Sequence, residues 1–346
     1  MKVLLYTDNH FSQYSSILRN RGERYSIRLE NQIKSINWVE RLAAEEGCTH
    51  VFCLGDFFDK ATLTAEEITA LKDIKWNENA YHYFIVGNHE MGTSDLTYST
   101  AHVFESLNFK TFKFVELLKI NDDVAFVILP YLTKDRRNTL KKYIEDLTLT
   151  EKANNYIVLS HNDIAGIRYG QYMSKDGFDI QDIYDNCKLF INGHLHNQTQ
   201  INDKTLNLGN LTGQNFSEDA LKHSHCAAIL DTDDFSIKLI VNPFALNFYK
   251  FEIYKESDID KTLSKCLPNS VLSIKAHQSL IDKIKEVIPS YLNIIQYRIV
   301  SVPEIVQTQT DTISELINTD HIQQFKDFIL SQIDNTTVLA EELSQL

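Results

Sequence analysis

The sequence of 346 residues has little proline, glycine or cysteine. Five prolines and 11 glycines are scattered through it without a low-complexity tract or an internal repeat. The five cysteines are odd in number, and no two of them have the spacing of a zinc finger. We therefore expect free thiols in a reducing compartment rather than a framework of disulfides.

Long hydrophobic runs are also missing. Nowhere do about 18 uncharged apolar residues follow one another, so we expect no helix that spans a membrane. A strand begins within a few residues of Met1, without a basic segment and an apolar segment before it, so we expect no signal peptide. Together these absences predict a cytoplasmic protein.

Positive charge is in short supply as well. The chain has 34 Lys and Arg residues against 47 Asp and Glu residues, which gives a formal net charge of −13. Nucleic-acid binders are often basic, so this balance argues weakly against a DNA or RNA partner. The net charge does not, however, determine the local electrostatic potential at a site. Divalent cations bound there would offset the negative charge of acidic ligands.

What is present is typical of a globular protein, with 43% hydrophobic and 23% charged residues. A chain of this length can bury a sizeable core and contain more than one domain. Over residues 1–244, apolar strands first alternate with helices and then follow one another closely. This pattern predicts an α/β (α+β) fold in which two packed β-sheets are flanked by helices.

Some elements of this first domain have clear local signals. Residues 27–46 carry apolar side chains at helical spacing, and Gly47 ends the predicted helix. We also expect a strand over 113–118 in the second sheet, a strand over 124–130 and a helix over 134–147.

The pattern restarts after Pro243. Residues 245–302 have the order strand, helix, strand, helix, strand, which predicts a small α/β domain. Residues 303–346 predict a linker rich in Thr, Gln and Glu, followed by a helix-loop-helix. Such short helices cannot bury an apolar stripe alone. The helix-loop-helix either packs back on its own domain or docks on the helices of a partner.

Polar residues follow five of the predicted strands, at the point where each strand ends. These residues are Asp8, His10, Asp56, Asn88 in a Gly-Asn-His-Glu turn, His161, His194 and His196. Because parallel strands of one sheet end at the same edge, we expect the side chains to converge there. Asp8 and His10 are two residues apart, as are His194 and His196, and in extended backbone this spacing places both side chains on one side.

The donor types indicate a metal site. For any one of these residues a loop or helix-capping role is the commoner outcome, but the recurrence at five strand ends favours metal binding. Imidazole and carboxylate donors suit manganese, iron or zinc, and differ from the cysteines of a structural zinc site. Seven donors fit two ions that share one carboxylate, and Asp56, central in the series, is the natural bridge. Two ions about 3.5–4 Å apart would clamp the attacking and leaving oxygens of a displacement at phosphorus.

The complete series is Asp-x-His, Gly-Asp-x-x-Asp, Gly-Asn-His-Glu, a lone His and Gly-His-x-His. It resembles the motif series of the calcineurin-like metallophosphoesterases over about the first 240 residues. The resemblance implies one ion held by Asp8, His10, Asp56 and His196. It implies a second ion held by Asp56, Asn88, His161 and His194. His89 would bind no metal and would stabilise the transition state or protonate the leaving oxygen.

Within this superfamily the chain looks most like the SbcD-type nuclease subunit of double-strand-break repair complexes. Asp59 is followed by Lys60-Ala61, whereas the phosphoprotein phosphatases have Arg-Gly there. The small second domain stands where these nucleases have a DNA-capping domain, and the helix-loop-helix where they dock on the coiled coil of an SMC/ABC-type ATPase. The stretch 208–216 departs from the Pro-Gly-Ser loop of the family, and the compact length resembles phage-encoded versions.

The resemblance implies a Mn²⁺-dependent DNA exonuclease and endonuclease with a two-metal mechanism. Such an enzyme would act in DNA end processing, recombination and repair. It would form a homodimer, bind DNA and the ATPase subunit, and work in the cytoplasm, that of the host if the chain is phage-encoded, without a membrane.

The candidate DNA contacts are basic residues that cluster in the sequence: Arg19, Arg21, Arg24, Arg136 and Arg137. Solvated charged faces explain these clusters equally well. Two other functions stay open. One is a phosphodiesterase or phosphatase acting on small molecules or phosphoproteins. The other is a non-catalytic scaffold, although scaffolds of this kind typically lose metal ligands and none is missing here.

Overall fold

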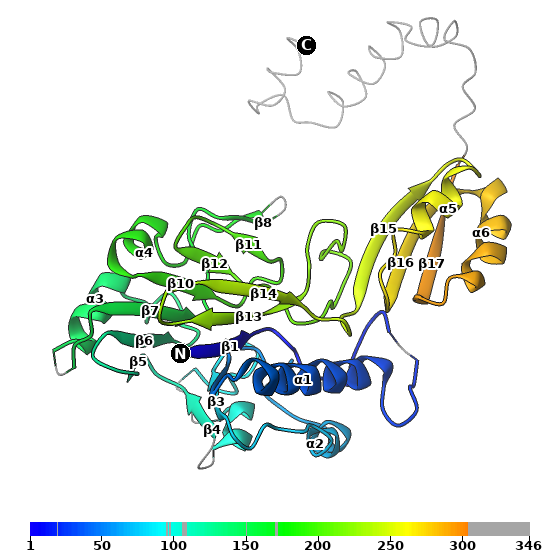
Figure 1. Cartoon of the computed structure of the whole chain (residues 1–346). Helices are drawn as coiled ribbons and strands as arrows, with labels where there is room; N and C mark the ends of the chain where they lie inside the picture. Colours follow the sequence, from blue (N-terminus) through cyan, green and yellow to red (C-terminus); the bar gives the residue numbers. More distant parts are fainter. Residues whose placement is uncertain are drawn as a thin grey trace, which may run out of the picture. The chain divides into compact units, whose positions relative to one another are not determined.

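The structure is a computed structural model of the chain (Figure 1). It describes residues 1–303 apart from residues 19, 95, 97, 106–108, 150 and 170–171. Met1–Val300 form one compact unit, and Ser301–Leu346 belong to a second. Beyond Pro303, the predicted linker and helix-loop-helix lie outside the described residues.

The first sheet has six strands in the order β14-β13-β1-β2-β3-β4. Their bounds are β1 Lys2–Tyr6, β2 His50–Cys53, β3 Tyr81–Ile85, β4 Phe109–Phe112, β13 Cys226–Asp231 and β14 Ile237–Val241. Strands β1 to β4 are parallel neighbours, whereas β13 and β14 are antiparallel additions. The carboxyl ends of β1, β2 and β3 therefore share one edge of this sheet.

The second sheet also has six strands, in the order β11-β12-β10-β7-β6-β5. Their bounds are β5 Glu116–Lys119, β6 Val124–Leu129, β7 Asn155–Ser160, β10 Leu189–Asn192, β11 Thr199–Gln200 and β12 Thr205–Asn207. Strands β6, β7, β10 and β12 are parallel, and β5 and β11 run antiparallel at the two edges. A separate hairpin is formed by β8 (Arg168–Tyr169) and β9 (Tyr172–Met173).

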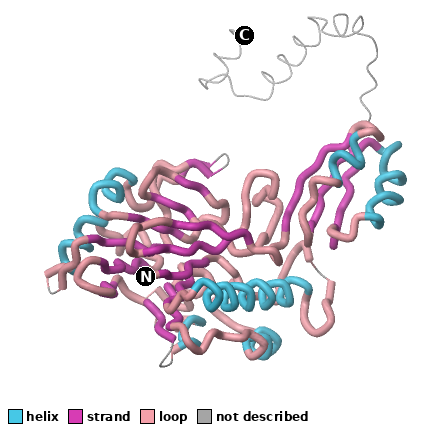
Figure 2. The backbone as a smooth tube through the Cα atoms, viewed as in Figure 1, coloured by secondary structure: helices cyan, strands magenta, loops and turns pink. Residues whose placement is uncertain are grey.

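Helices cover the outer faces of both sheets (Figure 2). On the first sheet lie α1 (Ile27–Glu46), α2 (Ala65–Leu71) and the short 3₁₀ helix η1 (Thr100–Phe104). On the second sheet lie α3 (Leu140–Leu147) and α4 (Ile180–Asn186). A further apolar core, which includes Leu5, Phe126 and Ile191, fills the space between the sheets. The predicted α/β fold of two packed sheets flanked by helices is thus confirmed.

Helix α1 has the bounds that the sequence predicts. The Ser26 side chain accepts a hydrogen bond from Leu29 N, which satisfies a backbone donor at the helix start. At the other end Gly47 adopts φ 71°, a left-handed conformation that glycine reaches without steric cost. Leu29, Ile36 and Val39 on the buried face are fully shielded from solvent.

Two predicted elements differ from the structure. The strand predicted over 113–118 begins only at Glu116, as β5 of the second sheet, because the preceding strand β4 ends at Phe112 in the first sheet. The chain passes between the sheets at this point, which periodicity alone does not reveal. The helix predicted over 134–147 begins only at Leu140, because the Thr139 side chain accepts from Lys142 N and caps it there.

The segment after β14 forms a three-stranded sheet in the order β15-β16-β17. Its elements are β15 Asn247–Ile253, α5 Asp258–Leu263, β16 Ser270–His277, η2 Gln278–Leu280, α6 Ile281–Val287, η3 Ile288–Ser290 and β17 Ile294–Val302. Helix residues such as Ile259 and Ile284 share a core with Phe251 and Ile274 of the strands. The predicted order of strands and helices is confirmed, whereas the domain boundary after residue 244 and a DNA-capping role stay predictions. We call residues 247–302 the small module.

No helix among the described residues has the length and apolarity needed to cross a membrane. All five cysteines are buried as free thiols, as the sequence predicts.

Candidate metal centre

The strand-end motifs converge where the carboxyl edges of the two sheets face each other. The motifs after β1, β2 and β3 carry Asp8, His10, Asp56 and Asn88, and those after β7 and β10 carry His161, His194 and His196. The prediction that one parallel sheet supplies them all is wrong, because β1 to β3 belong to the first sheet and β7 and β10 to the second. The site therefore depends on the packing of one sheet against the other.

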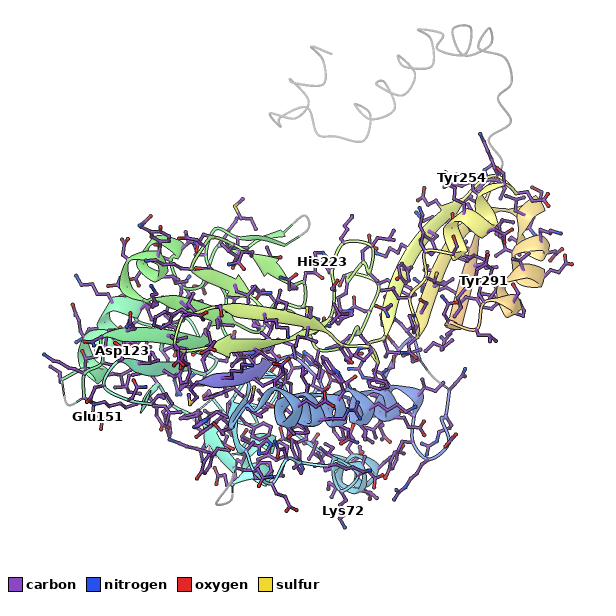
Figure 3. The ribbon with its side chains drawn as sticks, in the orientation of Figure 1. Lys72, Asp123, Glu151, His223, Tyr254 and Tyr291 are labelled. Carbon is purple, nitrogen blue, oxygen red and sulfur yellow. The ribbon has the colours of Figure 1, made fainter. Side chains whose placement is uncertain are left out.

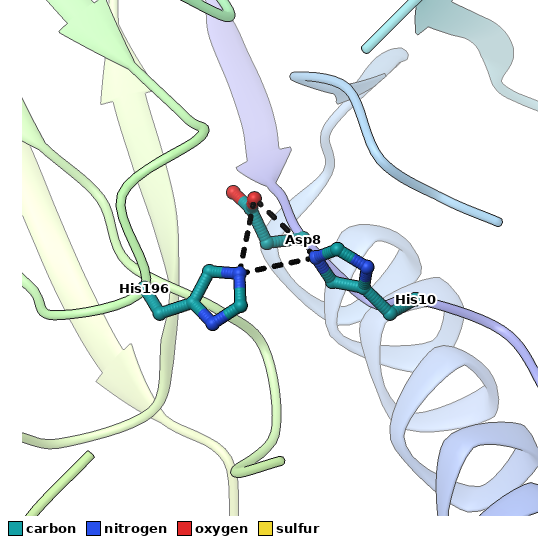
Figure 4. A group of neighbouring side chains, drawn as sticks. All are labelled: Asp8, His10 and His196. Atoms are coloured by element: carbon teal, nitrogen blue, oxygen red, sulfur yellow. Dashed lines mark hydrogen bonds and ion pairs between the residues drawn. The ribbon is translucent and has the colours of Figure 1, made fainter. Parts of the chain in front are cut away.

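Asp8, His10 and His196 form one group, whose donor atoms lie within 4.8 Å of one another (Figure 4). The Nε2 atoms of His10 and His196 are 3.1 Å apart. Asp8 Oδ1 lies 3.7 Å from the first of these atoms and 3.9 Å from the second. Metal–ligand bonds of about 2.0–2.2 Å place the donors of one ion roughly 3–4 Å apart. The observed distances suit three ligands of a single ion.

Asp56, His161 and His194 form a second group within the same distance limit of 4.8 Å. His161 Nε2 lies 3.1 Å from Asp56 Oδ2, and Asn88 Oδ1 lies 3.0 Å from His194 Nδ1. Asp56 Oδ2 is also 3.7 Å from Nε2 of His10, which belongs to the first group. Asp56 thus faces both groups, as a shared carboxylate would.

Each of the four imidazoles has its outer nitrogen beside an oxygen that can only accept a hydrogen bond. The pairs are His10 Nδ1 with Asp59 Oδ1 at 3.2 Å, His196 Nδ1 with Glu218 Oε1 at 2.8 Å, His161 Nδ1 with Leu54 O at 2.7 Å and His194 Nε2 with Asp163 Oδ1 at 3.4 Å. A nitrogen that faces such an oxygen carries the hydrogen. By this rule the inner nitrogens of neutral His10 and His196, which face each other, present lone pairs to the site, whereas those of His161 and His194 also face acceptor oxygens, of Asp56 and Asn88.

These inner atoms lack donors within the protein. As neutral rings, His10 and His196 point lone pairs at each other across 3.1 Å. Asp8 Oδ1 and His161 Nε2 are buried and make no hydrogen bond. A buried polar atom without a partner costs about 1–3 kcal/mol, and a cation that binds these acceptors removes that cost. The donor set fits metal ions, while the assignment of each ligand stays a prediction.

The backbone at the site is left-handed at several residues that are not glycine. Asp8, His10, Asp56 and His194 have φ values of 50°, 47°, 49° and 72°. Each such residue costs of order 1–3 kcal/mol and persists only where its surroundings enforce it. Asp8 and His10 do converge, but not through the extended backbone on which the sequence argument relied. The side chains reach one cluster because the chain turns sharply at both residues.

Glycines allow the turns to approach one another closely. A Cβ atom on Gly87 would overlap Asp56 Oδ1, and one on Gly55 would overlap the ring of His161. Glu90 holds the turn in place, because its buried carboxylate accepts hydrogen bonds from Gly87 N at 2.8 Å and from Phe58 N at 3.1 Å. The Gly-Asn-His-Glu sequence thus combines a close approach with an internal brace.

A family model described as calcineurin-like phosphoesterase matches residues 1–198, more than half of the chain. The chain belongs to the calcineurin-like phosphoesterase family. Membership of this family implies a metal-dependent hydrolase of phosphoesters. The matched residues include every predicted ligand and end just beyond His196 of the last motif, so the model spans every strand that feeds the site.

Several solved structures are similar to this one. The calcineurin-like phosphoesterase YfkN from Bacillus subtilis is 13% identical over 70% of this chain and 88% of its own, with a TM-score of 0.39. A dimetal phosphatase from Danio rerio is 13% identical over 70% and 98%, with a TM-score of 0.42. The protein TT1561 of Thermus thermophilus is 10% identical over 69% and 98%, with a TM-score of 0.39. None of the curated proteins compared matches the sequence.

The buried carboxylates of this phosphoesterase dominate the electrostatics of its site. Burial alone would lower the pKa of His10, but hydrogen bonds to Asp59 and Asp8 and the charge of Asp56 raise this pKa to about 10. Burial likewise disfavours the charged form of Asp56. The nearby histidines, above all His161, nevertheless hold the pKa of Asp56 well below its usual range. Without a cation, the raised pKa values of His10 and His161 mean that these two rings retain protons that balance the carboxylates, and a divalent cation takes the place of those protons.

His89 is placed differently from the other imidazoles. Its side chain is 41% exposed, and its Nδ1 lies 2.9 Å from the backbone oxygen of Asp59. Its ring packs edge-on to His10 with the centroids 4.6 Å apart. The hydrogen bond fixes the hydrogen on Nδ1, so Nε2 is the atom of His89 that is available to a substrate. This position at the exposed rim suits the catalytic role that the resemblance implies.

Three buried asparagines that sequence reasoning missed stand at the ends of β7, β10 and β12. Asn192 Nδ2 donates to Asn162 O at 2.9 Å and Gly193 O at 2.7 Å. Asn162 Nδ2 donates to Pro130 O at 2.9 Å, and its Oδ1 accepts from Leu132 N at 2.9 Å. Asn207 Nδ2 donates to Leu195 O at 2.7 Å. We call Asn162, Asn192 and Asn207 the asparagine brace, because they tie together the loops that carry His161, His194 and His196.

The acidic partners of the imidazoles were also missed as functional residues. Asp163 follows His161 by two residues, and Asp59 belongs to the Gly-Asp-x-x-Asp motif, so both lie beside recognised motifs. Glu218 has no such signal, because it lies 22 residues after His196 in an irregular loop. Only the path of the chain in space brings it to the site.

The arginines proposed as DNA contacts have partners within the chain. Arg21 Nη1 binds both carboxylate oxygens of Glu66 at 2.9 Å, and Arg24 Nη1 binds Asp73 Oδ2 at 2.7 Å. Arg136 donates to a backbone oxygen, and Arg137, with a side chain only 7% exposed, binds Asp176 at 2.8 Å. Arg19 lies outside the described residues. The DNA-binding role of these residues stays a prediction.

Two other histidines lie near the site without joining either group. His223 is on the loop between β12 and β13 (Figure 3). His225 is buried, and its Nδ1 lies 2.8 Å from Asn210 Oδ1. Neither is among the described His, Asp, Glu and Cys residues whose donor atoms cluster closely enough for a metal.

Proposed function

We propose that this chain is a Mn²⁺-dependent DNA nuclease, both exonuclease and endonuclease, that hydrolyses phosphodiester bonds with two metal ions. One observation carries the proposal: six Asp and His donors from two facing sheets form two adjoining groups, Asn88 lies beside the second group, and Asp56 faces both. Two adjoining ions suit the displacement of a phosphodiester oxygen, because charge develops on the attacking and the leaving oxygen alike.

The residues of the chain have distinct tasks in this proposal. Asp8, His10, Asp56 and His196 would hold one ion, and Asp56, Asn88, His161 and His194 the other. The ions would supply Lewis-acid stabilisation of charge at phosphorus and a nucleophile at neutral pH. His89, held by the backbone oxygen of Asp59, would orient the phosphate and give a proton to the leaving oxygen through Nε2.

Three features support a nuclease over a phosphatase. Lys60-Ala61 follow Asp59 in place of the Arg-Gly of the phosphoprotein phosphatases. The small module follows the phosphoesterase fold and has a core of its own. The last residues of the sequence are patterned as a linker and a helix-loop-helix, which we propose docks on an SMC/ABC-type ATPase. We further propose a homodimer, with a role in DNA end processing, recombination and repair.

The test is degradation of linear duplex and hairpin DNA by the metal-free chain after addition of Mn²⁺, Mg²⁺, Fe²⁺ or Zn²⁺ separately. We expect activity with Mn²⁺, and loss of about 10²–10⁴-fold in kcat for His89→Ala, the range typical of a general acid. His223→Ala is the matched control and keeps activity, because His223 belongs to neither donor group. A folded His89→Ala protein that degrades DNA at the wild-type rate would contradict the proposed mechanism.

The same assay separates the other two functions. Rapid hydrolysis of bis-p-nitrophenyl phosphate or p-nitrophenyl phosphate without any cleavage of DNA indicates an enzyme for small phosphoesters. Absence of bound Mn, Fe and Zn after reconstitution, measured by elemental analysis, indicates a scaffold. Purification with a co-expressed ATPase subunit, with and without residues 303–346, tests the partnership.

A further inference from the structure

The loop between β12 and β13 brings a buried carboxylate to the metal centre. Glu218 is 1% exposed, and its Oε1 lies 2.8 Å from Nδ1 of His196. An imidazole that binds a metal through one nitrogen is usually held through the other by such an acceptor, which fixes the tautomer and strengthens the donor. Glu218 thus stands behind one predicted ligand of the ion held with Asp8 and His10.

Glu218 is itself fixed by its own loop. Its Oε2 accepts from Asn210 Nδ2 at 2.9 Å and from Gln214 N at 2.7 Å. Its Oε1 also accepts from Asn215 Nδ2 at 3.2 Å. With four donors directed at it, the carboxylate has one preferred position, and the ring of His196 must follow that position.

The residues after Glu218 attach the loop to the small module. Ala220 N donates to Phe248 O at 3.0 Å, and Asp219 forms a bridge with Phe248 in β15. On the other side of Glu218, Phe216 packs edge-on to Phe248 with the ring centroids 5.2 Å apart. The carboxylate is therefore anchored on both sides by contacts that do not involve the metal centre.

The other imidazoles have weaker outer partners. Asp163, beside His194, has a side chain that is 28% exposed and lies 3.4 Å away. His161 has only the neutral backbone oxygen of Leu54. Of the three outer carboxylates, Glu218 lies closest to its imidazole, at 2.8 Å against 3.2 Å for Asp59 and 3.4 Å for Asp163, and its side chain is the most buried, at 1% exposed against 23% and 28%. The two groups of donors are therefore unequal in how firmly their imidazoles are held.

We propose that Glu218 is a positioning residue that orients His196 and thereby sets the affinity of the ion bound with Asp8 and His10. The second ion, bound with Asn88, His161 and His194, does not depend on it. This inference rests on the two-metal function proposed above, but not on DNA as the substrate. Its experiment measures metal binding, so its failure is distinguishable from failure of the nuclease proposal.

The experiment titrates Mn²⁺ into the metal-free full chain by isothermal titration calorimetry. Two background variants distinguish the two ions, because each variant disables one metal site. His194→Ala leaves the ion bound with His10 and His196, and His10→Ala leaves the ion bound with His161 and His194. In the His194→Ala background we expect Glu218→Ala to weaken Mn²⁺ binding by about 10–100-fold, the usual cost of losing such a partner. In the His10→Ala background we expect Glu218→Ala to leave the Mn²⁺ affinity unchanged.

Glu218→Gln tests the same contact with His196 and disturbs the loop less than Glu218→Ala does. Glutamine keeps an oxygen for Nδ1 of His196 but loses the charge, so we expect a smaller loss, again only in the His194→Ala background. Asp163→Asn is the matched control. It should show the reverse pattern, because Asp163 stands behind His194, and should weaken binding only in the His10→Ala background.

Circular dichroism and thermal unfolding show which variants are folded. If Glu218→Ala does not fold, Glu218→Gln decides the question in the same two backgrounds. Folded Glu218 variants that leave Mn²⁺ affinity unchanged in the His194→Ala background overturn the proposal. Equal losses in both backgrounds also overturn it, because they indicate a general effect on the loop. Loss confined to the His194→Ala background supports it, whether or not the chain cleaves DNA.

Discussion

The two sheets hold their metal-binding side chains in different ways. The first sheet uses strained turns: Asp8, His10 and Asp56 have left-handed backbone, and glycines let these turns lie against one another. The second sheet has left-handed backbone at only one of its predicted ligands, His194, and relies mainly on side-chain hydrogen bonds, because the asparagine brace ties its loops together. Steric fit therefore mainly positions the donors of the first sheet, and side-chain hydrogen bonds mainly position those of the second sheet.

Removal of metal affects both halves and has the largest expected effect. Chelation by EDTA followed by desalting should abolish hydrolysis of bis-p-nitrophenyl phosphate, because no cation then stabilises charge at phosphorus. It should also lower thermal stability, since a ligand at 100 times its Kd contributes about 2.7 kcal/mol to the native state. Activity assays and differential scanning calorimetry, with Mn²⁺ returned as the control, measure both effects. Full activity in the metal-free protein would contradict the assignment of the site.

Gly87→Ala tests the steric half. The new methyl group would overlap Asp56 Oδ1 and displace the carboxylate that faces both donor groups. A displacement of about 1 Å at a reacting centre lowers the rate about 10²-fold, and overpacking costs about 1–3 kcal/mol. We expect a fall of that order in kcat/KM for bis-p-nitrophenyl phosphate.

Gly47→Ala is the control for this substitution. Gly47 has a positive φ of 71°, unlike Gly87, and a Cβ there meets no atom within 4 Å. A residue forced into left-handed backbone costs about 1–2 kcal/mol, so stability should fall while kcat/KM stays unchanged. Equal activity losses at Gly87 and Gly47 would mean that the close approach of Gly87 to Asp56 has no special importance.

Asn192→Asp tests the hydrogen-bonded half and should have the smallest effect. The substitution keeps the shape of the side chain but replaces its donor by an oxygen that faces Asn162 O and Gly193 O. An unsatisfied buried group costs about 1–3 kcal/mol. We expect a lower midpoint of urea unfolding and about a tenfold loss of kcat/KM, in line with the lower end of outer-partner effects.

Asn202, in the β11–β12 turn away from the brace, provides the matched control through Asn202→Asp. Its Oδ1 accepts from Lys204 N and Thr205 N, and aspartate keeps that oxygen. Wild-type stability and activity in Asn192→Asp would show that the brace is dispensable and that the two halves do not differ as described.

Much of the site was visible in the sequence because its residues stand at strand ends in short motifs. The apolar runs fix where each strand stops, and a polar residue at that point can only face the edge of a sheet. Glu218 and the asparagine brace could not be found in this way. A buried asparagine after a strand has the same sequence signature as one in a solvated turn, and Glu218 lies in a loop without periodicity.

The boundaries of the elements show the same division. Helix α1 is specified locally, because Ser26 and Gly47 cap its ends and its apolar face has helical spacing. The break between β4 and β5 is not specified locally, because the sequence of consecutive extended residues looks the same whether they stay in one sheet or cross to another. Local signals determine an element, whereas its neighbours decide which sheet it joins.

The sequence by itself determined the strands, the helices and the types of donor at each strand end, since these depend on nearby side chains and backbone. The tertiary structure alone decided that the donors come from two facing sheets and that Glu218 stands behind His196, and it places Asp56 beside both groups, as the sequence predicted. Those relations join residues far apart in the chain, such as His10 and His196, which are 186 positions apart. Contacts over such separations arise from packing, which no local pattern records.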